Sequence, residues 1–232
     1  MSNYTTSTMA SSSVVSSLFK SLYMQMAAAL TVTGLTAYLL AQSPAAMSYI
    51  FANSASIWII MFAEIALVIW LSARIAHLSM TSATLLFILY SVLTGVTFST
   101  LFIAYTGQSI ATTFFVTAGT FCASALVGYI TRMDLSRMGN LLYTLLIGLI
   151  IATIVNIFLG STTLYWITTY AGVVIFTGLI AWDTQKIKTL FMEHGTMDES
   201  SQKLALLGAL TLYLDFINLF LHLLRILGGN RE

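Results

Sequence analysis

Long apolar runs separated by short polar connections dominate the hydrophobic pattern of the chain. Seven of these runs are about as long as a membrane-crossing helix, which needs roughly 20 apolar residues. They cover residues 22–41, 57–73, 84–105, 110–130, 141–159, 165–182 and 205–227. The pattern therefore predicts an all-α polytopic membrane protein with seven transmembrane helices. The connections after the third and fifth runs are very short, so the helices that flank each of them should run antiparallel.

The last run carries polar side chains that share one helical face. At intervals of four, three, four and three residues come Thr211, Asp215, Asn218, His222 and Arg225. Residues with this spacing lie on one side of a helix. A carboxylate near the middle of a bilayer is costly, so Asp215 should face protein or water rather than lipid. We therefore expect the other six helices to wrap around a central C-terminal helix.

Composition narrows the class of protein further. Of the 232 residues, 58% are hydrophobic and only 7% are charged, whereas a soluble domain has about 25% charged residues. The net charge of +1 gives no basic field for nucleic acid. The single cysteine, Cys122, excludes an internal disulfide and a multi-cysteine metal site. The only proline is Pro44, in a connection, so a break inside a span must come from Gly or from Ser and Thr.

The ends of the chain differ from the apolar body. Residues 1–19 are rich in Ser and Thr and carry no charge, whereas a secretory signal begins with positive charge and has a short apolar core. We interpret residues 1–19 as a flexible cytosolic tail. Residues 20–228 then form the seven-helix transmembrane domain, and residues 229–232 form a short C-terminal tail.

The distribution of Lys and Arg predicts the orientation in the membrane, because these residues are enriched in cytoplasmic connections. With the N-terminus taken as cytoplasmic, the cytoplasmic side holds Lys20, Arg74, Arg132, Arg137, Lys186, Lys188 and Lys203. The opposite side holds only Arg225 and Arg231, both next to the last run. The seven-to-two asymmetry favours a cytoplasmic N-terminus. A re-entrant last segment, with the C-terminus back inside, is the alternative topology, and the length of that segment favours a full span.

Two acidic residues lie on consecutive, antiparallel runs. Asp183 ends the sixth run near Lys186 and Lys188, so it is either an interfacial acid or part of a site. Asp215 lies near mid-bilayer in the seventh run, where an acid more often marks an ion or proton path than a structural hydrogen bond. If the two carboxyl groups meet, they cannot both ionise cheaply in a low dielectric and will share a proton. Such a pair would be a pH switch and, when doubly ionised, a transient ligand for Ca²⁺.

Other polar residues in the spans allow more than one interpretation. Glu64, midway along the second run, is either part of a cation path or a hydrogen-bonded packing residue. Arg74, at the cytosolic end of the same run, is either a latch that pairs with Asp183 or an arginine that serves topology. A lone His222 is a poor metal site, and a hydrogen bond within the bundle is its plain alternative. We expect Asn156 and Asn218 to donate interhelical hydrogen bonds.

Motifs of common enzymes are missing. The chain has no GxSxG, no HExxH and no phosphate-binding glycine loop followed by Lys and Ser or Thr. Asp183 and Asp215 also lack the Gly-any-Gly-Asp context of intramembrane aspartyl proteases. We therefore expect no enzymatic activity and no cofactor.

Two segments resemble a known family. TGLIAWDTQKIK, residues 177–188, and GALTLYLDFINLFLHLLRILG, residues 208–228, closely resemble the Bax inhibitor-1 family, also called the transmembrane Bax inhibitor motif proteins. TRMDLSRMGN, residues 131–140, is similar to its bacterial inner-membrane branch. The likeness covers about residues 18–228.

This resemblance implies a seven-helix bundle with the last helix central and a pH-sensitive calcium leak, with Ca²⁺ as the transported ion. By motif match, Asp183 and Asp215 would form the di-aspartyl pH sensor and gate. Arg74 is the candidate for the family's latch arginine, and Glu64 matches its second-span acid and is the candidate for the cation path.

Two rival functions stay open. Relatives of this family are associated with a membrane-anchored quality-control protease, and animal members with cell-death proteins. The chain would then be a regulatory membrane protein that binds such a partner through its tail or cytosolic connections. A proton-coupled transporter is the second rival. The sequence leaves the oligomeric state open.

Overall fold

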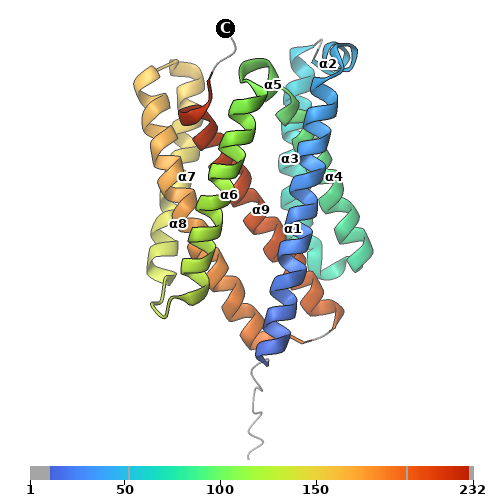
Figure 1. Ribbon diagram of the computed structural model, residues 1–232, viewed down its shortest axis with the longest axis vertical. Coiled ribbons are helices and arrows are strands. Elements are labelled where there is room, and N and C mark those ends of the chain that lie inside the picture. The colour runs from blue at the N-terminus through green and yellow to red at the C-terminus, as the bar shows by residue number, and fades with distance from the viewer. Residues whose placement is uncertain (1–10, 52, 197, 230–232) are drawn as a thin grey trace, which may run out of the picture. The chain divides into compact units, whose positions relative to one another are not determined.

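The computed structural model describes residues 11–51, 53–196 and 198–229 (Figure 1). Seven of its helices are long and apolar enough to cross a membrane, which confirms the predicted all-α polytopic class. The helices are α1 (Ser12–Ala41), α2 (Pro44–Phe51), α3 (Ser54–Arg74), the 3-10 turn η1 (Ile75–His77), α4 (Met80–Ser99), α5 (Leu101–Ala104), α6 (Gly107–Ile130), α7 (Ser136–Leu159), α8 (Thr162–His194) and α9 (Glu199–Leu227).

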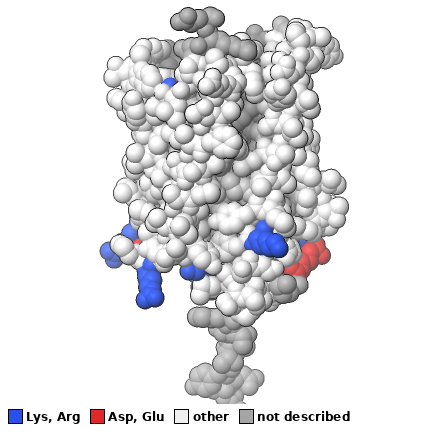
Figure 2. Space-filling view, in the orientation of Figure 1, with Lys and Arg blue, Asp and Glu red and all other residues white. Residues whose placement is uncertain are grey.

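The surface of these helices suits a lipid environment. In the space-filling view almost all of the visible surface is neither acidic nor basic (Figure 2). Large apolar side chains are exposed along α3 and α7, among them Phe62, Ile69, Ile157 and Phe158. In water such patches would be unusual, whereas hydrocarbon solvates them.

The chain divides into two compact units. Unit 1 comprises residues 1–100 and 187–210, and unit 2 comprises residues 101–186 and 211–232. α8 and α9 therefore each contribute residues to both units.

Unit 1 is built on close packing between α1 and α4. The Thr33 hydroxyl of α1 donates a 3.0 Å hydrogen bond to the Ser91 carbonyl of α4. Gly95 brings the α4 backbone against Thr36, because a Cβ at Gly95 would lie 2.6 Å from the Thr36 Cβ. Small residues allow this approach in lipid, where packing rather than the hydrophobic effect joins helices.

Unit 2 gathers α6, α7 and parts of α8 and α9. α6 begins beside the end of α9, where the Thr106 amide donates to the Gly229 carbonyl and the Gly229 amide donates to Ser109 Oγ. α7 ends at Leu159 and is followed by Gly160, whose φ of 60° is the left-handed conformation that favours glycine. The short connection to α8 follows directly, as the sequence predicts.

The first helix begins earlier than predicted. The tail expected over residues 1–19 is wrong for its second half, because α1 starts at Ser12. Val15, Leu18 and Phe19 are buried, and their spacing of three and one continues the buried stripe of α1. Residues 1–10 and 230–232 lie outside the described residues, so most of the two expected tails is not covered.

The sixth and seventh helices are longer than their apolar runs. α8 continues twelve residues past Trp182, and α9 begins six residues before Ala205. The polar residues after Trp182 end the hydropathy signal but not the helix. Ile180, Thr184, Ile187 and Phe191 are all buried, at intervals of four, three and four residues that keep one face in the interior.

The third span is broken where hydroxyl residues cluster. α4 ends at Ser99 and α5 begins at Leu101. The Ser99 and Thr100 hydroxyls donate to the Val96 and Thr97 carbonyls, each three residues back. This is the kind of break expected in spans that lack proline.

α9 is the most extensively buried of the seven spans, as the prediction for a central helix requires. It is one unbroken helix over Glu199–Leu227. The re-entrant alternative needs a turn inside this segment, and α9 contains none.

Candidate functional site

Two acidic side chains meet inside unit 2. Asp183 of α8 and Asp215 of α9 are 4% and 7% exposed. Their carboxyl groups lie within hydrogen-bonding reach of each other. The two side chains thus meet, which is the condition that a shared proton requires, and Asp183 is buried within the protein.

The chemistry of this contact depends on a proton. An ionised carboxylate is an acceptor only, so two carboxylates cannot hydrogen-bond to each other. The bond between Asp183 and Asp215 therefore requires a proton on one of them. With both groups ionised, the contact turns into repulsion between like charges in a low dielectric.

A lysine and a tyrosine interact electrostatically with the aspartate pair. Lys186, one turn after Asp183 on α8, attracts the Asp183 carboxylate through its charge. Its ammonium lies 4.9 Å from the centroid of the Trp182 ring, a cation–π distance. Tyr143 of α7 lies within electrostatic range of both aspartates.

The turn that carries Asp183 is held by two close helix contacts. At Gly128 of α6 an added Cβ would lie 2.0 Å from the Ala181 carbonyl oxygen. At Gly139 of α7 it would lie 2.1 Å from the Trp182 ring. The two residues that precede Asp183 thus pack directly against glycines. A larger side chain must displace the backbone of the turn at Gly128 and the Trp182 ring at Gly139.

A third contact fixes the same turn from the other side. Gln185, two residues after Asp183, donates from Nε2 to the Met133 carbonyl at 2.8 Å and accepts from the Leu135 amide at 2.9 Å. Met133 and Leu135 belong to the connection between α6 and α7. One amide side chain therefore ties this connection to the Asp183 turn.

The other acid predicted to lie in a span belongs to unit 1. Glu64 of α3 is half-buried and accepts a hydrogen bond from the Thr97 hydroxyl of α4. This contact agrees with the hydrogen-bonded interpretation of Glu64, and its place on a cation path stays a prediction. Arg74 ends α3, where its side chain is exposed, and the latch role stays a prediction too.

The polar face of α9 is only partly as expected. Asn218 donates to the Leu214 carbonyl of its own helix at 2.8 Å, and Asn156 accepts from the Ser161 amide at the end of α7. The prediction that these two residues donate between helices is wrong, because each side chain meets a backbone group near its own position. Thr211 and His222 are half-buried and buried, respectively.

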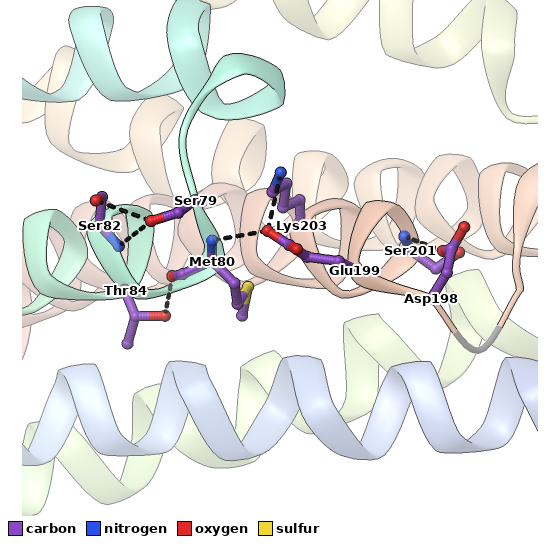
Figure 3. Close-up of polar contacts among 8 residues, drawn as sticks. All are labelled: Ser79, Met80, Ser82, Thr84, Asp198, Glu199, Ser201 and Lys203. Carbon is purple, nitrogen blue, oxygen red and sulfur yellow. Dashed lines mark hydrogen bonds and ion pairs between the residues drawn. The ribbon is translucent and has the colours of Figure 1, made fainter.

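Acidic groups outside the pair are satisfied in a different way. In unit 1, Asp198 accepts from the Ser201 amide at 2.9 Å, and Glu199 accepts from the Met80 amide and pairs with Lys203, each at 3.1 Å (Figure 3). These contacts cap α9 and join its start to the start of α4. Hydrogen bonds to the ionised form lower the pKa of Asp198 below its usual value.

The carboxylates of the pair are also the candidate cation ligands. Among the described residues, no group of three or more His, Cys, Asp or Glu side chains could hold a metal ion. Two carboxylates alone give a hard cation such as Ca²⁺ few of its six to eight oxygen ligands. A cation held here would be bound weakly and would keep much of its water.

Comparison with known proteins decides the family. The family model described as "Inhibitor of apoptosis-promoting Bax1" matches residues 15–232. The chain belongs to the Bax inhibitor-1 family. This confirms the resemblance stated from residues 177–188 and 208–228.

Three relatives with high sequence identity are bacterial proteins. "Inner membrane protein YbhL" of Escherichia coli is 50% identical over 210 residues, which is 90% of each chain. An uncharacterized protein of Rickettsia prowazekii is 48% identical over 174 residues, which is 75% of this chain and 73% of that one. An uncharacterized protein of Borreliella burgdorferi is 42% identical over 207 residues, or 89% of each.

The residues that position the pair were not found from the sequence. The Asp183 turn is fixed by Gly128, Gly139 and Gln185. In the sequence, however, the glycines are two small residues among many, and Gln185 is a polar residue that follows a span. Their signal was faint: Gln185 lies within the family-like segment 177–188, and Gly139 within the segment 131–140. The contacts of each become visible only when distant helices are brought together.

Proposed function

We propose that this protein is a pH-sensitive calcium leak channel, gated by protonation of the Asp183–Asp215 pair. The observation that carries the proposal is the contact between these two buried carboxyl groups within a membrane-spanning chain. With one shared proton the pair bonds α8 to α9. With both groups ionised the pair repels, and the two carboxylates attract a divalent cation.

The location that we propose is the bacterial inner membrane, with the N-terminus in the cytoplasm. The printed name of the E. coli relative supports the membrane, and the excess of Lys and Arg in one set of connections supports the orientation. In this proposal the protein acts as a passive conductor, neither an enzyme nor a carrier with a resident cofactor.

Calcium flux in vesicles tests the proposal. Purified protein is reconstituted into liposomes that contain a calcium-sensitive dye, and the pH is stepped from about 5 to about 8, the range in which paired buried carboxyl groups commonly titrate. We expect calcium entry to depend on pH in the native protein and to lose this dependence in Asp215→Asn. Asn does not ionise, so the pair can no longer reach the doubly charged state in which its two side chains repel each other.

A matched control removes an acid outside the pair. Asp134 is exposed and accepts from the Ser136 amide in the connection before α7. Asp134→Asn should keep the pH dependence of the native protein. If Asp215→Asn also keeps it, the sensor role is refuted, and if the native protein passes no calcium, the channel itself is refuted.

Arg74 and Glu64 are proposed as accessory residues. In the proposal Arg74 stabilises the closed state, so Arg74→Ala should raise the calcium leak at neutral pH. No rise would leave Arg74 as a topology residue. Glu64 is the candidate for the cation path, and Glu64→Gln should lower the flux without changing its pH dependence.

A further inference from the structure

Three exposed basic side chains lie at the end of unit 2 where α6 runs into α7. This basic patch consists of Arg132 in the connection, Arg137 at the start of α7 and Lys186 of α8. Figure 2 shows several basic side chains gathered over this end. None of the three forms an ion pair with an acid in the part of the chain that the structure describes. Their charges are therefore free to meet a ligand.

Gln185 brings the members of the basic patch together. Its side chain donates to the Met133 carbonyl at 2.8 Å and accepts from the Leu135 amide at 2.9 Å. One member directly precedes Met133, one follows Leu135 by two residues, and one directly follows Gln185. Consecutive Cα atoms are about 3.8 Å apart, so all three long side chains start close to the same two hydrogen bonds. Topology requires only an excess of Lys and Arg on one side, whereas this contact gathers them in one place.

The acids near the basic patch do not neutralise it. Asp134, in the same connection, is exposed, accepts a hydrogen bond from the backbone at the start of α7 and interacts with the charge of Arg137. Asp183, whose charge attracts Lys186, is buried. The exposed surface thus carries three positive charges against one negative charge. This balance favours an anionic ligand.

Apolar and aromatic side chains border the basic patch. Met133 is 74% exposed, and Ile130 at the end of α6 is 63% exposed. The Trp182 ring lies 4.9 Å from the Lys186 ammonium and packs edge-on against Tyr143 of α7 at 5.2 Å. Trp and Tyr are enriched at the depth of lipid headgroups. The surroundings of the patch therefore suit a molecule with an anionic head and apolar tails.

We propose that the basic patch binds the headgroup of an anionic phospholipid, whose acyl chains lie against the exposed apolar side chains beside it. The guanidinium of an arginine presents planar donors that match two phosphate oxygens, and a lysine adds a point charge. Clusters of basic residues at the ends of membrane helices bind anionic headgroups in this way. An acidic protein segment is the other ligand of suitable charge, and the apolar border favours the lipid. The site does not depend on calcium conduction.

Native mass spectrometry of the full chain in detergent tests the site. Dioleoylphosphatidylglycerol and dioleoylphosphatidylcholine, which share their acyl chains and differ in headgroup charge, are titrated separately. We expect the native protein to bind the first molecule of the anionic lipid at least about tenfold more tightly than that of the zwitterionic lipid. Arg132→Gln and Lys186→Gln should each weaken binding of the anionic lipid about fivefold, which corresponds to about 1 kcal/mol per basic residue. Binding of the zwitterionic lipid should not change.

Two control variants sharpen the test. Lys20→Gln removes an exposed basic residue of unit 1 and should keep the native preference for the anionic lipid. Arg137→Lys retains the charge and should stay within about twofold of the native affinity, whereas Arg137→Gln should lose about fivefold. All of these side chains are exposed, so the variants should fold.

The outcomes identify the ligand. Equal affinity of the native protein for the two lipids overturns the proposal, as does a loss in Lys20→Gln that equals the loss in the patch variants. A polyglutamate peptide that binds the native protein but not the patch variants, while their preference for the anionic lipid persists, overturns it in favour of an acidic protein partner. Each readout is independent of calcium flux, so failure of the proposed channel leaves the lipid site standing and loss of the lipid site leaves the channel standing.

Discussion

Three acidic groups of unit 1 and the acid pair in the spans of unit 2 have opposite kinds of hydrogen-bond partner. Glu64 accepts from a threonine hydroxyl, and Asp198 and Glu199 accept from backbone amides. These donors carry hydrogens at every pH of interest. Asp183 and Asp215 have each other, and neither has a hydrogen to give once both are ionised.

The difference teaches where sensitivity to pH should arise. An acid beside a neutral donor keeps its contact when it ionises, and the contact even strengthens because hydrogen bonds to charged groups are the stronger ones. An acid beside an acid loses its contact when the second proton leaves. Burial alone therefore does not make a sensor, and the partner decides.

The comparison predicts its largest effect for substitutions of the acids themselves. In Asp183→Asn the pH dependence of calcium flux should fall from about tenfold or more to about twofold or less, because the remaining acid no longer shares a proton with a second one. In Glu64→Gln the dependence should persist, since a Gln oxygen still accepts from Thr97. Calcium flux into vesicles, measured for both variants across the same pH steps, checks these two expectations. A sensitive Asp183→Asn, or an insensitive Glu64→Gln, would contradict the comparison.

The second effect concerns the helix contact that holds the Asp183 turn. Gly128→Ala places a Cβ 2.0 Å from the Ala181 carbonyl oxygen, and such overpacking costs about 1–3 kcal/mol. Gly119→Ala, on the same helix, meets nothing within 4 Å and should stabilise the helix by up to about 1 kcal/mol. The free energy of unfolding in mild detergent should thus move in opposite directions in the two variants.

A change of the same sign in both glycine variants would show that helix propensity, and not the approach of α6 to α8, sets the outcome. The pH profile of calcium flux adds a second measurement. It should shift in Gly128→Ala, where the Asp183 turn is displaced, and stay in place in Gly119→Ala.

How far the sequence alone leads depends on the kind of signal. Seven apolar runs gave the seven spans, and the four-and-three spacing of Asp215 and its neighbours gave the polar face of α9. Hydropathy could not predict the helical extensions at Phe191 or Ser12, because those segments are polar overall and are held by a few buried side chains. The start of α1 and the end of α8 were therefore both misplaced.

The site divides in the same way. Asp183 and Asp215 stand out because acids are rare in spans, and their motif context made the pair predictable. The contacts of Gly128 with Ala181 and of Gln185 with Met133 join residues about 50 positions apart, where periodicity carries no information. The local bonds of Asn156 and Asn218 were missed for the opposite reason, since a polar residue in a span was assumed to reach across helices.

A smaller effect should follow from releasing the connection between α6 and α7. Gln185→Ala removes two hydrogen bonds, at about 1 kcal/mol in total for a partly exposed site. Gln185→Glu keeps the acceptor for the Leu135 amide but turns a second acceptor oxygen toward the Met133 carbonyl, so its loss of stability should be at least as large. Hydrogen exchange at the Leu135 amide resolves the two variants: fast in Gln185→Ala and close to native in Gln185→Glu. Equal exchange in both would mean that this side chain does not hold the connection.

The smallest effect of pH is expected at Asp198, because its hydrogen-bond donors are neutral groups and not a second acid. Its pKa is lowered by hydrogen bonds from Ser201 and Thr196, so its contribution to stability is present above the usual pKa of an aspartate and is lost as the pH falls through the lowered value. At neutral pH the cap at the start of α9 should therefore be independent of pH. Asp198→Asn keeps a capping oxygen, so hydrogen exchange of the Ser201 amide should stay near native at neutral pH. In acid this variant should keep its cap, because Asn does not gain a proton there. Asp198→Ala has no capping oxygen and should speed exchange at every pH. A cap that weakens between about pH 8 and about pH 6 in the native protein, while paired acids in the spans titrate, would erase the distinction between the two kinds of acid.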